Sequence, residues 1–198
     1  ILPPERRLPG IRQQIDRQSY FVVHAPRQVG KTTCFRSLAF SLTQEGRYTA
    51  LHTSCETGQS ARNDVERGVQ AVCDAVYMDS DRQIPEELRP PKGDPQVSPD
   101  SRLKDQLMRW SRTHPRPVVL FLDEIDALQD DVLISVLRQL RSGYMARPQQ
   151  FPQSVALIGL RDVRDYKVKL RPDADSLGTS SPFNIKVESL SIRDFTQE

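Results

Sequence analysis

The residues best suited to chemistry begin at Ala25, where the chain reads Ala-Pro-Arg-Gln-Val-Gly-Lys-Thr. This spacing matches the phosphate-binding pattern GxxxxGK[ST], except that Ala25 stands where the pattern has its first glycine. A short apolar run, YFVVH, comes just before, and a helical pattern follows from Thr32. Because a strand, a tight turn and a helix are the context that such a turn requires, we predict a cradle for a polyphosphate.

Each residue of the predicted cradle has an expected role. Gly30 lets the backbone approach the phosphates, and the Lys31 ammonium reaches the β- and γ-phosphates. The Thr32 hydroxyl is expected to ligate Mg²⁺, and Thr33 to contact the α-phosphate. The residues expected to contact the nucleotide are Ala25, Pro26, Arg27, Gln28, Val29, Gly30, Lys31, Thr32 and Thr33. The sequence therefore predicts an ATP site with a magnesium ion.

A second group of candidate residues follows the most apolar run of the chain, VVLFL, as Asp123-Glu124-Ile125-Asp126. Carboxylates at the carboxyl end of a central parallel strand lie in the crevice where such sheets bind ligands. We expect Asp123 to hold Mg²⁺ and Glu124 to polarise a water for attack on the γ-phosphate. Asp126 is interpreted as a helix cap or a supporting residue.

Apolar runs alternate with helical patterns along the chain, which is typical of a parallel sheet with crossover helices. The spacing predicts strands over 20–24, 48–55, 118–122, 155–160 and, at an edge, 183–187. Helices are expected over 32–44, from a cap at Ser60 onward, over 101–112 and over 131–141. Five prolines within 80–100 predict a loop or a poorly ordered insertion there. The expected fold is a three-layer α/β sandwich.

Composition adds limits to these predictions. The net charge of +2 is too small to indicate nucleic-acid binding, although residues 1–36 hold seven basic residues against two acidic ones. No apolar run is long enough to cross a bilayer. Cys34, Cys55 and Cys73 lack the spacing of a metal site, which predicts reduced thiols in a cytoplasmic protein.

The stretches APRQVGKTT, VVLFLDEID and VALIGLRD resemble the P-loop, the Walker B strand and the sensor-1 strand of AAA+/STAND-type ATPases. NDVERGVQAV and DVLISVLRQLRSGY are similar to a bacterial AAA-like ATPase family related to the archaeal ATPases. The resemblance implies a five-stranded parallel P-loop NTPase sheet in the order 5-1-4-3-2. It also implies a basic leader over 1–18, the ATPase domain over 19–190 and the start of a helical lid over 191–198.

Two arginines acquire roles through this resemblance. Relatives carry an arginine that senses the γ-phosphate where Arg161 stands, and they often present an arginine finger to a neighbouring subunit from the region of Arg138 and Arg141. Of that pair Arg141 is the expected finger, as a catalytic group acting between subunits. The resemblance also implies that the Pro-rich leader before Gly10 seats the adenine base.

Several functions fit these motifs. We favour an ATP-driven regulatory switch, with self-association or partner domains and no membrane contact. A DNA-associated ATPase of the initiator or transposition-regulator type is the first alternative, and a nucleotide-binding scaffold without hydrolysis is the second. A helicase related to the DExD box is disfavoured because Gln28 replaces a glycine of that family's loop. The LSGGQ signature of ABC-type ATPases is absent from the sequence.

Overall fold

A computed structural model describes residues 7–24, 30–159 and 188–191 of the chain. In these ranges one parallel sheet contains β1 (Tyr20–His24), β2 (Thr49–Ser54), β3 (Val118–Asp123), β4 (Ser154–Gly159) and β5 (Glu188–Ser191). The strands lie side by side in the order β2-β3-β4-β1-β5. The predicted parallel α/β fold is confirmed, with its first four strands in the order 1-4-3-2. The strand expected over 183–187 falls outside the described residues, and β5 begins at Glu188 instead.

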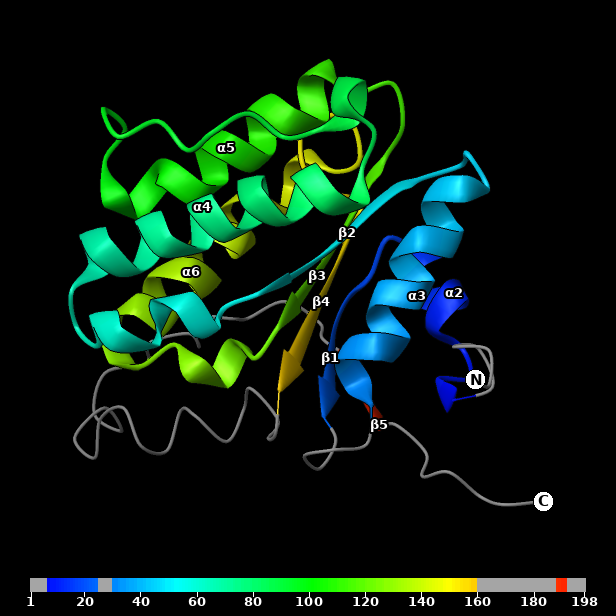
Figure 1. Cartoon of the computed structure of the whole chain (residues 1–198), viewed down its shortest axis with the longest axis horizontal. Coiled ribbons are helices and arrows are strands. Elements are labelled where there is room, and N and C mark those ends of the chain that lie inside the picture. The colour runs from blue at the N-terminus through cyan, green and yellow to red at the C-terminus, as the bar shows by residue number, and fades with distance from the viewer. Residues whose placement is uncertain (1–6, 25–29, 160–187, 192–198) are drawn as a thin grey trace.

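Helices cover both faces of the sheet and so produce three layers (Figure 1). On one face lie α2 (Ile11–Asp16) and α3 (Lys31–Gln44), and on the other lie α4 (Val65–Gln83), α5 (Pro99–Thr113) and α6 (Asp130–Gly143). Short 3-10 turns connect them: η1 (Glu56–Ala61), η2 (Glu86–Leu88), η3 (Ile125–Ala127) and η4 (Tyr144–Ala146). None of the helices in the described ranges has both the length and the hydrophobicity that crossing a bilayer requires.

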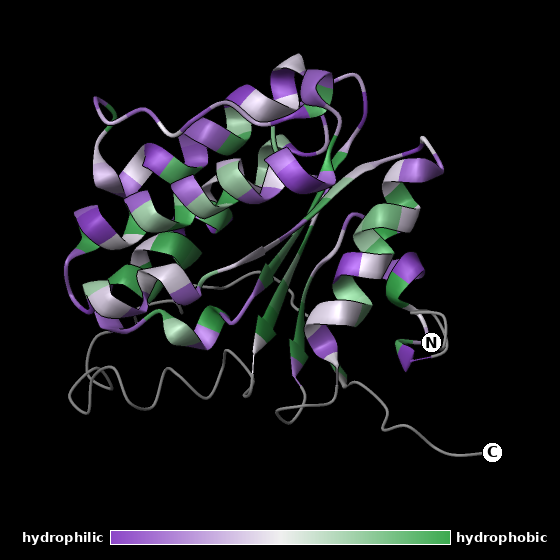
Figure 2. Ribbon diagram, in the orientation of Figure 1, coloured by the Kyte–Doolittle hydropathy of each residue, from purple (hydrophilic) through white to green (hydrophobic). Residues whose placement is uncertain are grey.

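The strands are apolar on both sides because each side is buried under helices. Leu51, Leu120 and Leu157 point into the core beneath α4 and α6, whereas Phe121 and Ile158 point into the core beneath α3. Hydropathy colouring shows the apolar strands enclosed between helices whose outer faces are polar (Figure 2). All three cysteines are buried thiols and form no disulfide.

Part of the N-terminal leader belongs to the core. Leu8, Ile11 and Ile15 are almost fully buried in the same cluster as Phe35 and Leu38 of α3. The helix α2 therefore packs beside the helix that follows the predicted phosphate cradle, as Figure 1 shows.

The start of α4 differs from the expectation. Ser60 lies inside η1, and Asp64 is the N-cap, because its side chain accepts a hydrogen bond of 3.0 Å from the backbone N–H of Arg67. An aspartate at this position satisfies a first-turn amide that has no partner inside the helix.

The Pro-rich segment is also more ordered than predicted. Residues 80–83 form the last turn of α4, and Pro99 begins α5, so only 84–98 lie between helices. Side chains of α5 donate hydrogen bonds of 2.9–3.1 Å to the carbonyl oxygens of this segment: Trp110 to Leu88, Gln106 to Pro91 and Arg102 to Pro95. Prolines provide no N–H but keep their carbonyl acceptors, so a helix rich in donors can hold such a segment in place.

We expect Gly68→Ala to destabilise the protein, although alanine is the better helix former by about 1 kcal/mol. A Cβ at Gly68 of α4 would lie 2.5 Å from Val132 Cγ1 in the buried contact with α6. Overpacking of a well-filled core costs about 1–3 kcal/mol, which exceeds the gain in helix propensity. Urea denaturation measures the difference. Combined with Val132→Ala, the loss should fall below the sum of the two single losses; strict additivity would contradict a steric origin.

Candidate functional site

The start of α3 has the features of an anion-binding helix N-terminus. Gly30 is its N-cap, with φ 70° and ψ 31° in the left-handed region that glycine adopts without strain. Lys31 and Thr32 form the first turn, where amide N–H groups have no partner within the helix and the helix dipole is positive. The carboxyl ends of β1, β3 and β4 lie at the same end of the sheet as the start of α3 (Figure 1).

The predicted magnesium ligands lie in direct contact. The Thr32 hydroxyl donates a hydrogen bond of 2.8 Å to Asp123 Oδ2, although 91 residues separate them in the sequence. Both groups offer hard oxygen donors of the kind that Mg²⁺ prefers. Together they could hold one cation at the point where the phosphate-facing helix meets the end of β3.

A pocket of about 480 Å³ opens at this contact, which is within the usual range for small-molecule sites. It receives residues from the start of α3, from η1, from the turn after β3 and from the end of β4. Its lining residues are Gly30, Lys31, Thr32, Glu56, Gln59, Asp123, Glu124, Asp126, Ala127 and Gly159. Of the predicted cradle, residues 25–29 lie outside the described ranges, so Ala25, Pro26, Arg27, Gln28 and Val29 stay predictions.

The charges of the described lining residues favour the binding of a phosphate together with a cation. Glu56, Asp123, Glu124 and Asp126 bring four carboxylates against the single ammonium of Lys31 among these lining residues. A polyphosphate placed here would be repelled by the carboxylates unless a divalent cation lay between the two. The lining therefore fits a metal–nucleotide complex better than a free nucleotide.

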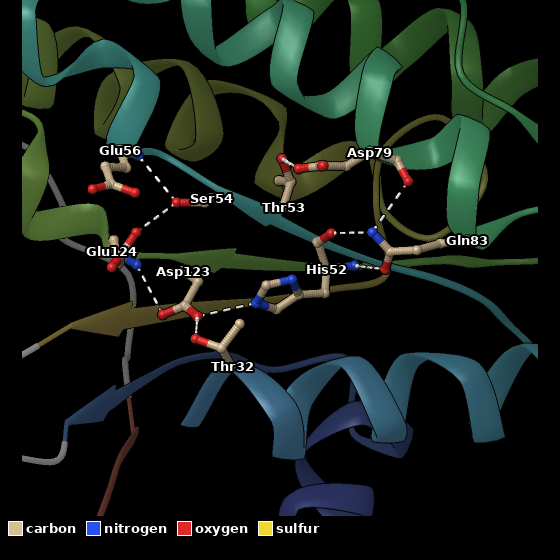
Figure 3. Close-up of polar contacts among 9 residues, drawn as sticks. All are labelled: Thr32, His52, Thr53, Ser54, Glu56, Asp79, Gln83, Asp123 and Glu124. Atoms are coloured by element: carbon tan, nitrogen blue, oxygen red, sulfur yellow. Dashed lines mark hydrogen bonds and ion pairs between the residues drawn. The ribbon is translucent and has the colours of Figure 1, made fainter. Parts of the chain in front are cut away.

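Asp123 is almost fully buried and accepts three hydrogen bonds (Figure 3). Oδ2 lies 2.8 Å from the Thr32 hydroxyl and 3.0 Å from His52 Nε2, and Oδ1 accepts the backbone N–H of Glu124 at 2.9 Å. Burial by itself raises the pKa of this carboxyl, but the hydrogen bonds from His52 and Thr32 outweigh it and leave the pKa below its ordinary value. Asp123 is thus held as a carboxylate before any ligand arrives.

Glu124 has the opposite environment. It is exposed, and its backbone adopts φ 53° and ψ 40°, a left-handed conformation that costs a non-glycine residue about 1 kcal/mol or more. This turn directs the chain sharply out of the sheet into η3. The Glu124 carboxylate accepts a hydrogen bond of 2.7 Å from the hydroxyl of Ser54, which lies at the end of the neighbouring strand β2. The two consecutive acids therefore differ in solvent exposure: Asp123 is buried and Glu124 is exposed.

The remaining predicted residues lie in different places. Asp126 is in η3, and a Cβ added to Gly159 at the end of β4 would lie 2.9 Å from its Oδ1, so a side chain there would require Asp126 to shift. Arg141 is in the last turn of α6, roughly 16 Å along that helix from its start at about 1.5 Å per residue. The pocket lining does not include it. Arg161 falls outside the described residues.

Two polar residues of β2 join the site without having been predicted. His52 contacts Asp123, and Ser54 contacts Glu124. The isolated histidine and serine belong to no motif, and each meets its partner across 70 or 71 residues of sequence. The parallel register of β2 beside β3 brings them there, since Ser54 pairs with Asp123.

Known proteins give matching results. A sequence profile described as an AAA domain matches residues 13–166. The fold is similar to solved structures of Drosophila ORC bound to poly(dA/dT) DNA and Cdc6 (TM-score 0.57, 12% identity) and to GC-rich DNA and Cdc6 (TM-score 0.58, 11% identity). These alignments cover 96% of this chain but only 29% and 28% of those chains, and at such identities the likeness shows the fold alone. No curated protein matches the sequence.

The environment of Asp123 predicts a pH-dependent stability. The folded-state pKa is lowered, so the carboxylate stabilises the fold above the pKa of the unfolded chain, near 4, and this contribution is lost as the pH falls through the folded pKa. Asp123→Asn should therefore cost about 1–3 kcal/mol near pH 7, as the loss of hydrogen bonds to a charged group does. Denaturation series from pH 7 to 3 should show the two proteins converging in acid. A difference that stays constant with pH would contradict this explanation.

Proposed function

Because the chain belongs to the AAA domain family, we propose that it binds ATP with Mg²⁺ in the pocket at the start of α3 and hydrolyses it. The observation that carries the proposal is the 2.8 Å contact between the Thr32 hydroxyl and Asp123, in the lining of a pocket of suitable size. It joins the helix that faces the phosphates to the strand that supplies the metal ligand. Lys31 binds the β- and γ-phosphates from the first turn of that helix.

The binding roles follow from the lining. Thr32 and Asp123 hold the metal, and the first-turn amides and Lys31 hold the phosphate oxygens. When bound, the cation neutralises charge on the phosphates beside the four carboxylates. The adenine site and the γ-phosphate sensor, for which Arg161 is proposed, involve residues outside the described ranges.

Glu124 is the proposed general base. It is exposed at the pocket, unlike Asp123, and it is held by one hydrogen bond from Ser54, so a water in the pocket can reach its carboxylate. Taking a proton from that water would assist its attack on the γ-phosphate. This arrangement favours hydrolysis over a scaffold that only binds nucleotide. The strained backbone at Glu124 supports a functional role for its position.

We infer that the domain acts as a switch within a larger protein or assembly. The similar ORC chains are more than three times as long as the aligned region, and their structures hold DNA and Cdc6. Arg141 lies in the last turn of α6, outside the described pocket lining, and we propose that it acts on the nucleotide of a neighbouring subunit. DNA association is the alternative, and a steep salt dependence of DNA binding would favour it.

The binding half of the proposal is tested with Lys31→Ala. Removing two charge-assisted hydrogen bonds to phosphate, at about 1.5–3 kcal/mol each, should weaken ATP binding by at least about 100-fold. Isothermal titration calorimetry measures the affinity, and thermal melting checks that the fold is intact. Lys104→Ala is the matched control, because Lys104 bonds to Ser142 away from the pocket, and it should bind as the wild type does. Unchanged affinity in Lys31→Ala would remove this pocket as the phosphate site.

The hydrolytic half is tested with Glu124→Gln, which keeps the size of the side chain and removes the base. We expect ATP affinity within a few-fold of wild type and a turnover at least about 100-fold slower, as loss of a positioned base produces. Phosphate release under saturating ATP measures it. Glu56→Gln changes another carboxylate of the same pocket and should alter turnover far less. Normal turnover in Glu124→Gln would assign the base to another residue.

A further inference from the structure

His52 occupies an unusual place for an imidazole. Its exposed fraction is only 5%, on a strand whose other inward residues include Ala50 and Leu51. A buried polar side chain costs free energy unless it is hydrogen-bonded, so a histidine here needs a partner that repays its desolvation. That partner is Asp123, with Nε2 to Oδ2 at 3.0 Å.

The contact defines which atom carries the proton. An ionised carboxylate only accepts hydrogen bonds, so Nε2 of His52 must be the donor, and the neutral imidazole suffices for this. Asp123 Oδ2 then receives two donors of different origin. The Thr32 hydroxyl comes from α3, the helix that meets the phosphates, whereas His52 comes from the sheet itself (Figure 3).

The strand that carries His52 is held from its outer side. Strand β2 lies at the edge of the described sheet. The side chain of Gln83, in the last turn of α4, accepts a hydrogen bond from the His52 N–H at 3.2 Å and donates one to the His52 carbonyl at 2.7 Å. The next residue, Thr53, donates to Asp79 of the same helix at 2.8 Å. These hydrogen bonds between β2 and α4 therefore restrain the backbone that carries the His52 imidazole.

We propose that His52 is a positioning residue, which holds Asp123 in the orientation for binding the cation before nucleotide arrives and independently of α3. This inference rests on the proposed function, and it adds a supporting residue that touches neither nucleotide nor metal. A metal ligand fixed in advance loses less conformational freedom on binding, and removal of such supporting hydrogen bonds commonly weakens metal affinity by about 10- to 100-fold. A role in packing alone would leave metal affinity unchanged.

The test compares His52→Met with His52→Gln in the same chain. The two side chains are similar in length and volume, but only glutamine has an N–H donor at its end. A fluorescent ATP analogue is titrated first in EDTA and then at fixed concentration with increasing Mg²⁺. His52→Met should raise the Mg²⁺ concentration for half-maximal effect by at least about 10-fold, with affinity in EDTA within two-fold of wild type. His52→Gln should recover most of that loss.

Thr53→Val is the matched control, because it removes a partly buried hydrogen bond to α4 from the same strand, and this bond does not involve Asp123. It should melt at a lower temperature but need no more Mg²⁺ than wild type. Melting curves confirm folding of each variant, and His52→Leu replaces His52→Met if the latter does not fold.

An unchanged Mg²⁺ requirement in the folded His52→Met variant would overturn the inference. An increase of equal size in Thr53→Val would overturn it as well, because the effect would then come from general loosening of β2. Wild-type protein whose nucleotide binding does not respond to Mg²⁺ would overturn the proposed function itself, and with it this inference. The two failures are therefore distinguishable.

Discussion

The structure around the site depends on the satisfaction of one buried charge, the carboxylate of Asp123. A carboxylate taken from water and left without donors would be too costly to keep ionised. Asp123 meets three donors: a hydroxyl from α3, an imidazole from β2 and the next backbone amide. This requires β2 beside β3 and the start of α3 above the ends of the strands, which is what the parallel order β2-β3-β4-β1 provides.

Two adjacent carboxylates, those of Asp123 and Glu124, lie in different environments. Asp123 is buried and accepts three hydrogen bonds, whereas Glu124 leaves the sheet through a left-handed backbone and is exposed at the pocket. Binding a cation requires fixed oxygens, whereas taking a proton from water requires contact with water. The sharp turn after β3 allows neighbouring residues to meet both requirements, and Ser54 limits where the second carboxylate can go.

The periphery of the fold also reaches this site. The Pro-rich segment begins directly after Gln83, and α5 holds that segment through its carbonyl oxygens. Gln83 itself lies in the last turn of α4, where its side chain bonds to the backbone of His52. An unbroken series of hydrogen bonds and covalent neighbours thus leads from α5 through α4 and the edge strand to the buried carboxylate.

The sequence by itself determined the parallel α/β fold, the helix that begins at Lys31 and the acids after β3, because apolar periodicity and motif spacing act over a few neighbouring residues. Only the tertiary structure decided that His52 and Ser54 join these acids and that donors from α5 bind the Pro-rich segment. These contacts join residues from separate elements, and the pattern of neither partner alone identifies the other. They exist because strand order and register bring distant polar groups within bonding distance, where burial makes each unpaired group costly.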